Sequence, residues 1–322
     1  MITVQNLSKR YGRQQVLNNL SFSIPDGQVT GFLGPNGAGK STTMRCILGL
    51  DRPSAGSVNF SGAYLNGQPY SGSFSSLKHK SNVAGAVLDA AWFHPKRSGK
   101  GHLKVLADSA GVPRTRVDEC LEIVGLSSAA KRAAGGYSLG MKQRLSLAAA
   151  LLGNPQHLIM DEPVNGLDPE GVTWMRNIIR HLASEGRSLL VSSHLLSEMQ
   201  MTADRLVVIA RGEMVGEYSM DEFLSGGTYV SVTTESPAEK LIEILRGYGY
   251  TSSIDSAGKI RISAEDSQQF DEAQLRYLIA QIAVEHRLLI TELITKTENL
   301  EQRFLAATSA KQEYKMGATQ NV

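Results

Sequence analysis

Short apolar runs recur along the first two thirds of the chain, and each gives way abruptly to glycine or polar residues. The clearest are Val29–Leu33, His157–Met160 and Ser188–Val191, and Val207–Glu217 has the pattern of a strand, a turn and a second strand. Runs of this length bounded by turn residues are typical of buried strands. Helical spacing follows the first run, with apolar residues at Met44, Ile47 and Leu48. The pattern predicts an α/β fold.

The periodicity changes after a linker-like Ser225-Gly226-Gly227. The pattern predicts strands at 228–234, 251–255, 259–263 and 288–295, and helices at 238–246, 271–285 (amphipathic) and 300–307. The order β-α-β-β-α-β up to residue 295 suggests a small ferredoxin-like α+β domain. We therefore divide the chain into a first domain at 1–222, a second at 228–308 and a polar tail at 309–322.

Composition narrows the classes of function. The 322 residues suffice for two domains, and 33 basic against 31 acidic residues leave a net charge of +2, so no general basic field attracts nucleic acid. The two cysteines, Cys46 and Cys120, match no metal or disulfide spacing. The N-terminal residues lack the apolar core of a signal peptide, and no apolar run reaches the roughly 18 residues of a membrane span. We expect a soluble, cytoplasmic protein.

A glycine-rich loop between the first apolar strand and the helix after it carries the strongest chemistry. Its residues are Gly34, Pro35, Asn36, Gly37, Ala38, Gly39, Lys40, Ser41 and Thr42. The spacing G-x-x-x-x-G-K-[ST], in this strand–loop–helix context, is that of a phosphate-binding loop, in which backbone N–H groups surround phosphate oxygens. Lys40 would reach the outer phosphates and Ser41 would offer its hydroxyl to Mg²⁺. A glycine-rich turn that binds nothing is the weaker alternative.

Two carboxylates follow the apolar strand His157–Met160. Strand alternation points Asp161 and Glu162 in different directions, so the two can have different roles. Asp161 fits the aspartate that holds Mg²⁺ through its water shell, and Glu162 fits the general base that activates water. An Asp-Glu pair after a strand is more often a surface turn, and only the phosphate-binding loop upstream favours the functional interpretation.

A helix whose apolar part begins at Leu145 is preceded by Ser138, Gly140 and the polar trio Lys142-Gln143-Arg144, an unusual set for a helix start. The N–H groups at a helix start lack partners inside the helix, and such an end binds anions readily. The simpler interpretation is that Ser138 is an ordinary N-cap.

The segments GPNGAGKST, MDEP, NGLD and SSHLLSEM, in this order, resemble the nucleotide-binding subunit of an ATP-binding-cassette (ABC) transporter over residues 1 to about 220. The resemblance is closest to drug-export ATPases of the daunorubicin and bacitracin type. It implies a P-loop cassette with a RecA-like core and a helical subdomain at about 90–153, using ATP and Mg²⁺. It also implies that Ser138 and the backbone of Gly140 belong to the signature sequence, which faces the γ-phosphate of ATP held by a second subunit.

The resemblance assigns further positions one at a time. Tyr11 would stack on adenine with Val16 supporting it, His194 would contact the γ-phosphate, and Asp168 would lie in the loop that crosses to the opposite subunit. Each has a structural alternative. Tyr11 is equally consistent with a half-buried strand residue, a lone histidine such as His194 is usually structural, and Asp168 before Pro169 fits a helix cap.

The chain departs from the family pattern at three positions. Leu139 stands where the signature usually has glycine, and Met141 where it has glutamine. The family's loop glutamine, which touches Mg²⁺ and relays motion to the membrane partner, should fall near Asp89. This carboxylate could approach Mg²⁺ through water, or it could only cap a helix beginning near Ala90. The nearby basic side chains form a solvated face or a contact for acidic loops of the partner; they are Lys96, Arg97, Lys100 and Lys104.

The resemblance implies an ATPase that dimerises head to tail around two ATP molecules and drives a separate membrane permease, an exporter by family likeness. A C₂ homodimer would hold two identical sites. A soluble ABC ATPase without a transport role and a nucleotide-sensing adaptor remain as alternatives. No catalytic constellation lies past residue 220, which favours a dimerisation or regulatory role for the second domain.

Overall fold

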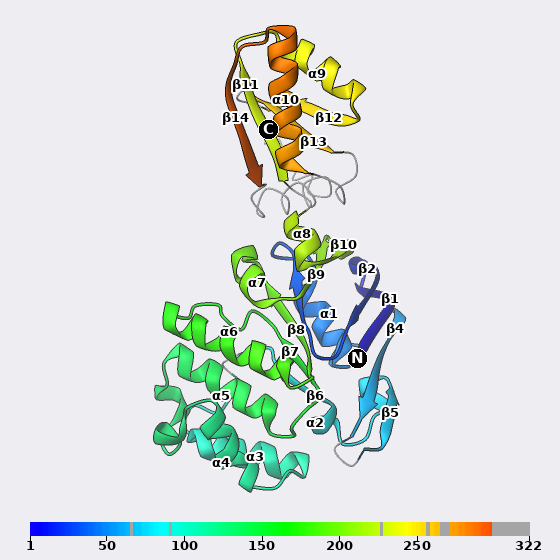
Figure 1. Ribbon diagram of the computed structural model, residues 1–322. Helices are drawn as coiled ribbons and strands as arrows, with labels where there is room; N and C mark the ends of the chain where they lie inside the picture. The colour runs from blue at the N-terminus through cyan, green and yellow to red at the C-terminus, as the bar shows by residue number, and fades with distance from the viewer. Residues whose placement is uncertain (65–66, 90–91, 226–227, 256–257, 265–270, 298–322) are drawn as a thin grey trace, which may run out of the picture. The chain divides into compact units, whose positions relative to one another are not determined.

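The computed structural model describes residues 1–322 except 65–66, 90–91, 226–227, 256–257, 265–270 and 298–322 (Figure 1). The chain forms two compact units, Met1–Met220 and the part that begins at Asp221. In the described residues no helix is both long and apolar enough to cross a bilayer. Each unit has its own core and is described separately.

The first unit contains two sheets. A four-stranded antiparallel sheet has the order β2-β1-β4-β5; its strands are β1 (Ile2–Tyr11), β2 (Gln14–Ile24), β4 (Ala55–Ala63) and β5 (Pro69–Gly72). A six-stranded sheet has the order β10-β9-β3-β8-β7-β6; its strands are β3 (Val29–Leu33), β6 (Ala84–Val87), β7 (His157–Met160), β8 (Ser188–Ser193), β9 (Arg205–Ala210) and β10 (Glu213–Ser219). All neighbours in this sheet are parallel except β10, which pairs antiparallel with β9. The carboxyl ends of β3, β7 and β8 therefore share one edge, where open parallel sheets bind ligands.

Helices cover the six-stranded sheet. Those attached to it are α1 (Lys40–Ile47), α2 (Lys80–Val83), α6 (Pro169–Ser184) and α7 (Leu196–Thr202), and a three-residue 3₁₀ turn lies at Phe74–Ser76. One core joins the two sheets and α1, because Phe60, Phe32, Met44 and Ile159 belong to the same buried cluster. This packing fixes the loop between β3 and α1 on both sides.

A helical subdomain is inserted between β6 and β7. It consists of α3 (Gly99–Ala110), α4 (Thr115–Ile123) and α5 (Leu139–Leu151), with 3₁₀ turns at Ser127–Ala129 and Ala134–Gly136. The predicted helix starting near Ala90 falls partly outside the described residues; the described residues 92–98 are not helical, and the first helix begins at Gly99 with Ser98 as its N-cap. The apolar helix begins six residues before Leu145, because Ser138 caps it.

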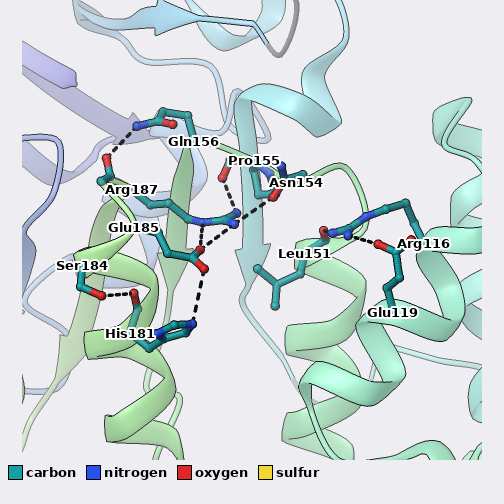
Figure 2. Close-up of polar contacts among 11 residues, drawn as sticks. Arg116, Glu119, Leu151, Asn154, Pro155, Gln156, His181, Ser184, Glu185 and Arg187 are labelled. Atoms are coloured by element: carbon teal, nitrogen blue, oxygen red, sulfur yellow. Dashed lines mark hydrogen bonds and ion pairs between the residues drawn. The ribbon is translucent and has the colours of Figure 1, made fainter.

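Two arginines fix the short linker between α5 and β7 (Figure 2). Arg116 of α4 donates to the carbonyl of Leu151 at 3.2 Å, at the end of α5. Arg187 donates to the carbonyl of Pro155 and to Oδ1 of Asn154, both at 2.9 Å. These bonds satisfy polar groups at the helix end and in the turn. They tie the helical subdomain to the strand that ends at Met160, directly before Asp161.

The second unit has the predicted β-α-β-β-α-β order. After α8 (Met220–Ser225), which begins at the boundary, its elements are β11 (Thr228–Thr234), α9 (Ala238–Gly247), β12 (Tyr250–Ile254), β13 (Ile260–Ala264), α10 (Glu272–His286) and β14 (Ile290–Thr297). The antiparallel sheet has the order β12-β13-β11-β14, which is the ferredoxin-like arrangement. Both helices contribute to one core, with Leu241, Leu245, Leu275 and Ile279 packed over the sheet. The helix predicted at 300–307 and the tail predicted at 309–322 lie outside the described residues.

Candidate nucleotide site

The glycine-rich loop between β3 and α1 has a backbone that only glycine readily adopts. Gly37 and Gly39 have φ of +81° and +106°. A Cβ on Gly39 would stand 2.5 Å from Cδ2 of Leu17, and one on Gly34 would stand 2.5 Å from the carbonyl oxygen of Ile209. The loop is therefore packed tightly on its inner side, whereas nothing lies within 4 Å of a Cβ on Gly37.

A hollow of about 310 Å³ opens over this loop. Its lining comes from the loop, the start of α1, the end of β7 and strand β2; the residues are Val16, Pro35, Asn36, Gly37, Gly39, Lys40, Ser41, Thr42, Asp161 and Glu162. The structure thus brings together both motifs, which are more than 100 residues apart in sequence. Gly34 and Ala38 shape the loop without lining the hollow.

Lys40 is the cation of the hollow. Its side chain is only 7% exposed, and Nζ donates to the carbonyl of Gly34 at 2.6 Å. Burial lowers the pKa of Lys40, against the opposing attraction of the carboxylates Glu162 and Asp161. Nζ also lies 3.7 Å from Oε1 of Glu162. A buried ammonium held among oxygen atoms is suited to bind phosphate oxygens.

Ser192, on the neighbouring strand β8, positions both carboxylate residues. Its hydroxyl donates to Oδ1 of Asp161 at 2.5 Å and accepts from the backbone N–H of Glu162 at 2.8 Å. Glu162 has a φ of +49°, an uncommon value for a residue with a side chain. This backbone conformation directs Glu162 toward Lys40 rather than along the strand.

His194 completes the cluster. Its Nδ1 lies 2.7 Å from Oε2 of Glu162, and the ring is partly exposed. The predicted base and the predicted histidine are therefore direct neighbours. The sequence analysis assigned no role to Ser192. The signal that could have indicated one is the polar Ser192-Ser193-His194 at the end of β8.

Ser138 and Asp168 lie at helix starts and do not line the hollow of their own chain. Ser138 Oγ accepts from the N–H of Met141 at 3.3 Å, and Asp168 Oδ1 accepts from Gly171 at 3.0 Å, so both are N-caps. Gly140 is in the first turn of α5. The side chain of Leu139 is 44% exposed and rests on Gly166, where a Cβ would stand 2.7 Å from its Cδ2. The signature segment around Leu139 and the loop that leads to Asp168 therefore lie side by side within one chain.

Tyr11 lies at the end of β1, outside the lining of the hollow, whereas Val16 is part of that lining. The hydroxyl of Tyr11 donates to the carboxylate of Asp51 at 2.7 Å, and this hydrogen bond raises the pKa of Tyr11. The ammonium of Lys9 stands 4.7 Å from the ring centroid. The ring is 45% exposed, so it has surface available for contact.

Asp89 follows β6 and lines a different depression, an apolar groove of about 440 Å³ between β6, α3 and α5. It still lies near the shared strand edge, because Val87 of β6 pairs with Met160 and accepts from the N–H of Asp161 at 2.8 Å. Trp92, 60% exposed, and buried His102 also line the groove. Among the described residues, Nδ1 of His102 has no hydrogen-bond partner, and burial lowers the pKa of this histidine.

Comparisons with known proteins agree with this geometry. The family described as ABC transporter matches residues 17–165. The chain is 34% identical over 316 residues, 97% of both chains, to an uncharacterized ABC transporter ATP-binding protein, YdbJ, of Bacillus subtilis (strain 168). It is 35% identical to the bacitracin transport ATP-binding protein BcrA of Enterococcus faecalis, over 94% of this chain and 95% of the relative. A solved ATP-binding subunit of an ABC transporter superposes with a TM-score of 0.60 at 25% identity, covering 69% of this chain and 91% of that one.

Proposed function

The chain belongs to the ABC transporter family as an ATP-binding subunit with ATPase activity, and we propose that it hydrolyses ATP in the hollow over the glycine-rich loop. One observation carries the assignment of the site: Lys40, Asp161 and Glu162 line a single hollow with the loop glycines. Triphosphate oxygens fit the backbone N–H groups of this loop and the ammonium of Lys40. Tyr11 and Val16 bind the adenine end.

The residues at the base of the hollow suit Mg²⁺. Mg²⁺ is usually held by one or two protein oxygens together with substrate phosphates and water. Ser41 supplies a hydroxyl and Asp161 a carboxylate, and both line the hollow. Bound there, the cation would neutralise charge on the phosphates. Ser192 keeps Asp161 oriented through its 2.5 Å hydrogen bond, and Asp89 would contribute to a bound Mg²⁺ through water.

Glu162 activates the attacking water as general base. His194, hydrogen-bonded to it, orients the carboxylate and contacts the γ-phosphate. The ammonium of Lys40 lies 3.7 Å from the other oxygen of this carboxylate, so Glu162 is held between Lys40 and His194.

A complete site requires a second chain. Ser138, Gly140 and Asp168 are absent from the lining of the hollow in their own chain, which is expected of residues that act on the partner's nucleotide. The N–H groups at the start of α5 form an anion site for the γ-phosphate held by the partner. Two chains related by a twofold axis would place two ATP molecules in equivalent interfaces. ATP binding closes this dimer, and hydrolysis opens it.

A separate permease binds the apolar groove. The loop that the family uses to relay motion to its membrane partner falls at Asp89, and Asp89 lines this groove together with exposed Trp92. An apolar segment of the permease carrying one polar group would cover Trp92 and give His102 the partner that its Nδ1 lacks among the described residues. The chain thereby sits on the cytoplasmic face of the membrane. Its relatives named for bacitracin and lantibiotic transport favour export of an antimicrobial compound.

Turnover by the purified chain tests this function. We expect ATP hydrolysis that requires Mg²⁺ and whose rate per chain rises with protein concentration, because two chains build each site. Lys40→Ala should abolish hydrolysis, while Lys131→Ala, at an exposed position of the helical subdomain, serves as the matched control. A rate per chain that is independent of concentration, in a chain shown to be monomeric with ATP, would contradict the composite site.

A further inference from the structure

Helix α10 of the second unit has apolar side chains on opposite sides. Leu275, Ile279 and Ile282 are buried against the sheet. On the outer side, Tyr277 is 67% exposed and Val284 is 82% exposed, with Ala280 between them. A helix at the surface of a single domain normally carries polar residues on its outer face. Tyr277, Ala280 and Val284 therefore form an apolar strip among polar residues on the outer side of the predicted amphipathic helix.

The neighbouring helix α9 shows the ordinary pattern. Its buried residues include Leu241 and Leu245, and its exposed positions before the final glycine are all charged; they are Glu239, Lys240, Glu243 and Arg246. Both helices lie on the same side of the same sheet, as Figure 1 shows for α9 and α10. The outer face of α10 is therefore a local feature of that helix.

We propose that the outer face of α10 binds the same face of a second copy of this chain, with the two helices antiparallel around a twofold axis near Ala280. Ala280 lies midway between Tyr277 and Val284, so this axis brings each tyrosine over the partner's Val284. Small side chains at the crossing allow two helices to approach to about 8–10 Å. A shallow hollow lined by Tyr277, Ala280, Gln281, Val284 and Glu285 runs along this face and receives the partner's side chains.

Charges along α10 favour the antiparallel direction. The acidic Asp271 and Glu272 lie at its start, followed by Arg276. Its end carries Glu285, then Arg287 together with Lys240, whose ammonium donates to the carbonyl of His286 at 3.3 Å. An antiparallel pair places the acidic start of one helix beside the basic end of the other, twice. It also aligns the helix dipoles favourably. A parallel pair would place like charges together at both ends.

This interface is independent of nucleotide. It would keep two ATPase chains together after hydrolysis opens the cassettes, so that the next closure is an intramolecular step at high effective concentration. Loss of the interface would therefore weaken ATP-driven pairing at low protein concentration without altering the residues of the ATP site.

Cysteine cross-linking tests the geometry without nucleotide. Ala280→Cys places a thiol next to the proposed axis, and Glu243→Cys places one on the outer face of α9 as the matched control. The native thiols are buried, which raises the pKa of Cys46 to about 11 and also raises that of Cys120, so neither should react. Under mild oxidation we expect a disulfide-linked dimer from Ala280→Cys and none from Glu243→Cys. No dimer, or equal dimer from both, would overturn the proposal.

Sedimentation without ATP gives an independent measurement. Val284→Asp adds a charge at an exposed position, so folding should be retained, and self-association should weaken at least tenfold while Glu243→Gln leaves it unchanged. A wild-type chain that is monomeric without ATP but pairs with ATP would refute this interface and leave the proposed ATPase dimer intact. If Val284→Asp instead loses only binding to the permease, the occupant is the permease and the proposal is wrong.

Discussion

The carboxylate of Glu162 bridges two cationic or hydrogen-bonding groups, and its closest partner is His194, with Nδ1 2.7 Å from Oε2. The other oxygen faces the ammonium of Lys40 at 3.7 Å. Because the backbone of Glu162 is in the left-handed region, this side chain is held at the point where β7 ends and the hollow begins. The pair places a base next to the group that binds phosphate.

Replacing Glu162 by glutamine removes the base and retains the size of the side chain. We expect Glu162→Gln to bind ATP while turnover falls by roughly 10²-fold or more, the usual effect of losing a general base. The closed dimer should accumulate with ATP and Mg²⁺, because hydrolysis no longer reopens it. Size-exclusion chromatography with and without ATP measures this at a protein concentration low enough for the chains to separate without ATP.

The matched control for this substitution is Glu185→Gln, at the far end of α6, where the carboxylate pairs with Arg187. It should leave turnover nearly unchanged. If Glu162→Gln retains the turnover of the wild type, Glu162 has no part in the chemical step.

Ser138→Arg should block the composite site without touching the phosphate-binding loop of its own chain. ATP binding within each chain should survive, and ATP-driven closure of the two cassettes and hydrolysis should fail, because the arginine fills the space reserved for the partner's γ-phosphate. Mixing Ser138→Arg with Lys40→Ala should restore one site built from two intact halves. A mixture that pairs no better than either variant alone would argue against sites shared between chains.

Asp89→Asn tests the carboxylate at the end of β6. Asparagine keeps the size and loses the charge, so the urea midpoint of unfolding should hardly change, while the Mg²⁺ concentration needed for half-maximal hydrolysis should rise. Asp118→Asn is the control, since that carboxylate pairs with Lys100 in the helical subdomain. Equal Mg²⁺ dependence in Asp89→Asn and wild type would remove Asp89 from the metal site.

The buried side chain of His157 should make the free energy of unfolding depend on pH. It is fully buried between the hydroxyls of Tyr70 and Ser188, 2.8 Å and 2.9 Å away, and burial lowers its pKa to about 3. The unfolded chain binds a proton below about pH 6.5, and the folded chain only below about 3. The contribution of His157 is therefore complete above pH 6.5 and is lost as the pH falls toward 3. The slope is at most about 1.4 kcal/mol per pH unit.

Urea unfolding at several pH values between 7 and 4 measures this effect. His157→Gln retains hydrogen-bonding capacity without titrating, so its free energy of unfolding should be lower at pH 7 and should depend less on pH in this window. The α-amino group of Met1 and the carboxylate of Asp26 also act on His157, and both remain in the variant. Parallel pH curves for the two proteins would mean that His157 is not the group responsible.

The parts of the site that lie within continuous motifs could be predicted from sequence. Lys40 and Ser41 follow a glycine spacing that fixes the loop, and Asp161 and Glu162 follow a strand whose apolar run is unambiguous. The α/β class and the β-α-β-β-α-β order of the second unit are confirmed for the same reason. Alternation and helical spacing are properties of short segments of sequence, and the apolar residues that they define are the ones that the core buries.

The contacts between distant segments could not be predicted. Ser192 reaches Asp161 only because β8 pairs with β7, a pairing between residues 31 positions apart. The exposed apolar residues of α10 could not be predicted either. From spacing alone they could belong to the buried side, and only the packing of α10 on the sheet shows which side is covered. Asp89 also depends on context, since its carboxylate lines a groove formed by helices that come later in the chain.

The hydrogen bond from Lys40 to the carbonyl of Gly34 makes nucleotide binding an exchange reaction. The ammonium already has an oxygen partner and a nearby carboxylate, so an incoming phosphate must replace contacts that the chain supplies to itself. The net affinity is therefore a difference between two similar sets of interactions, and it is smaller than the attraction of a bare ammonium for phosphate would be. When the product phosphate leaves, the carbonyl of Gly34 and the carboxylate of Glu162 take its place beside Lys40, so no buried charge is left unpaired. Turnover depends on that release as much as on the attack of water.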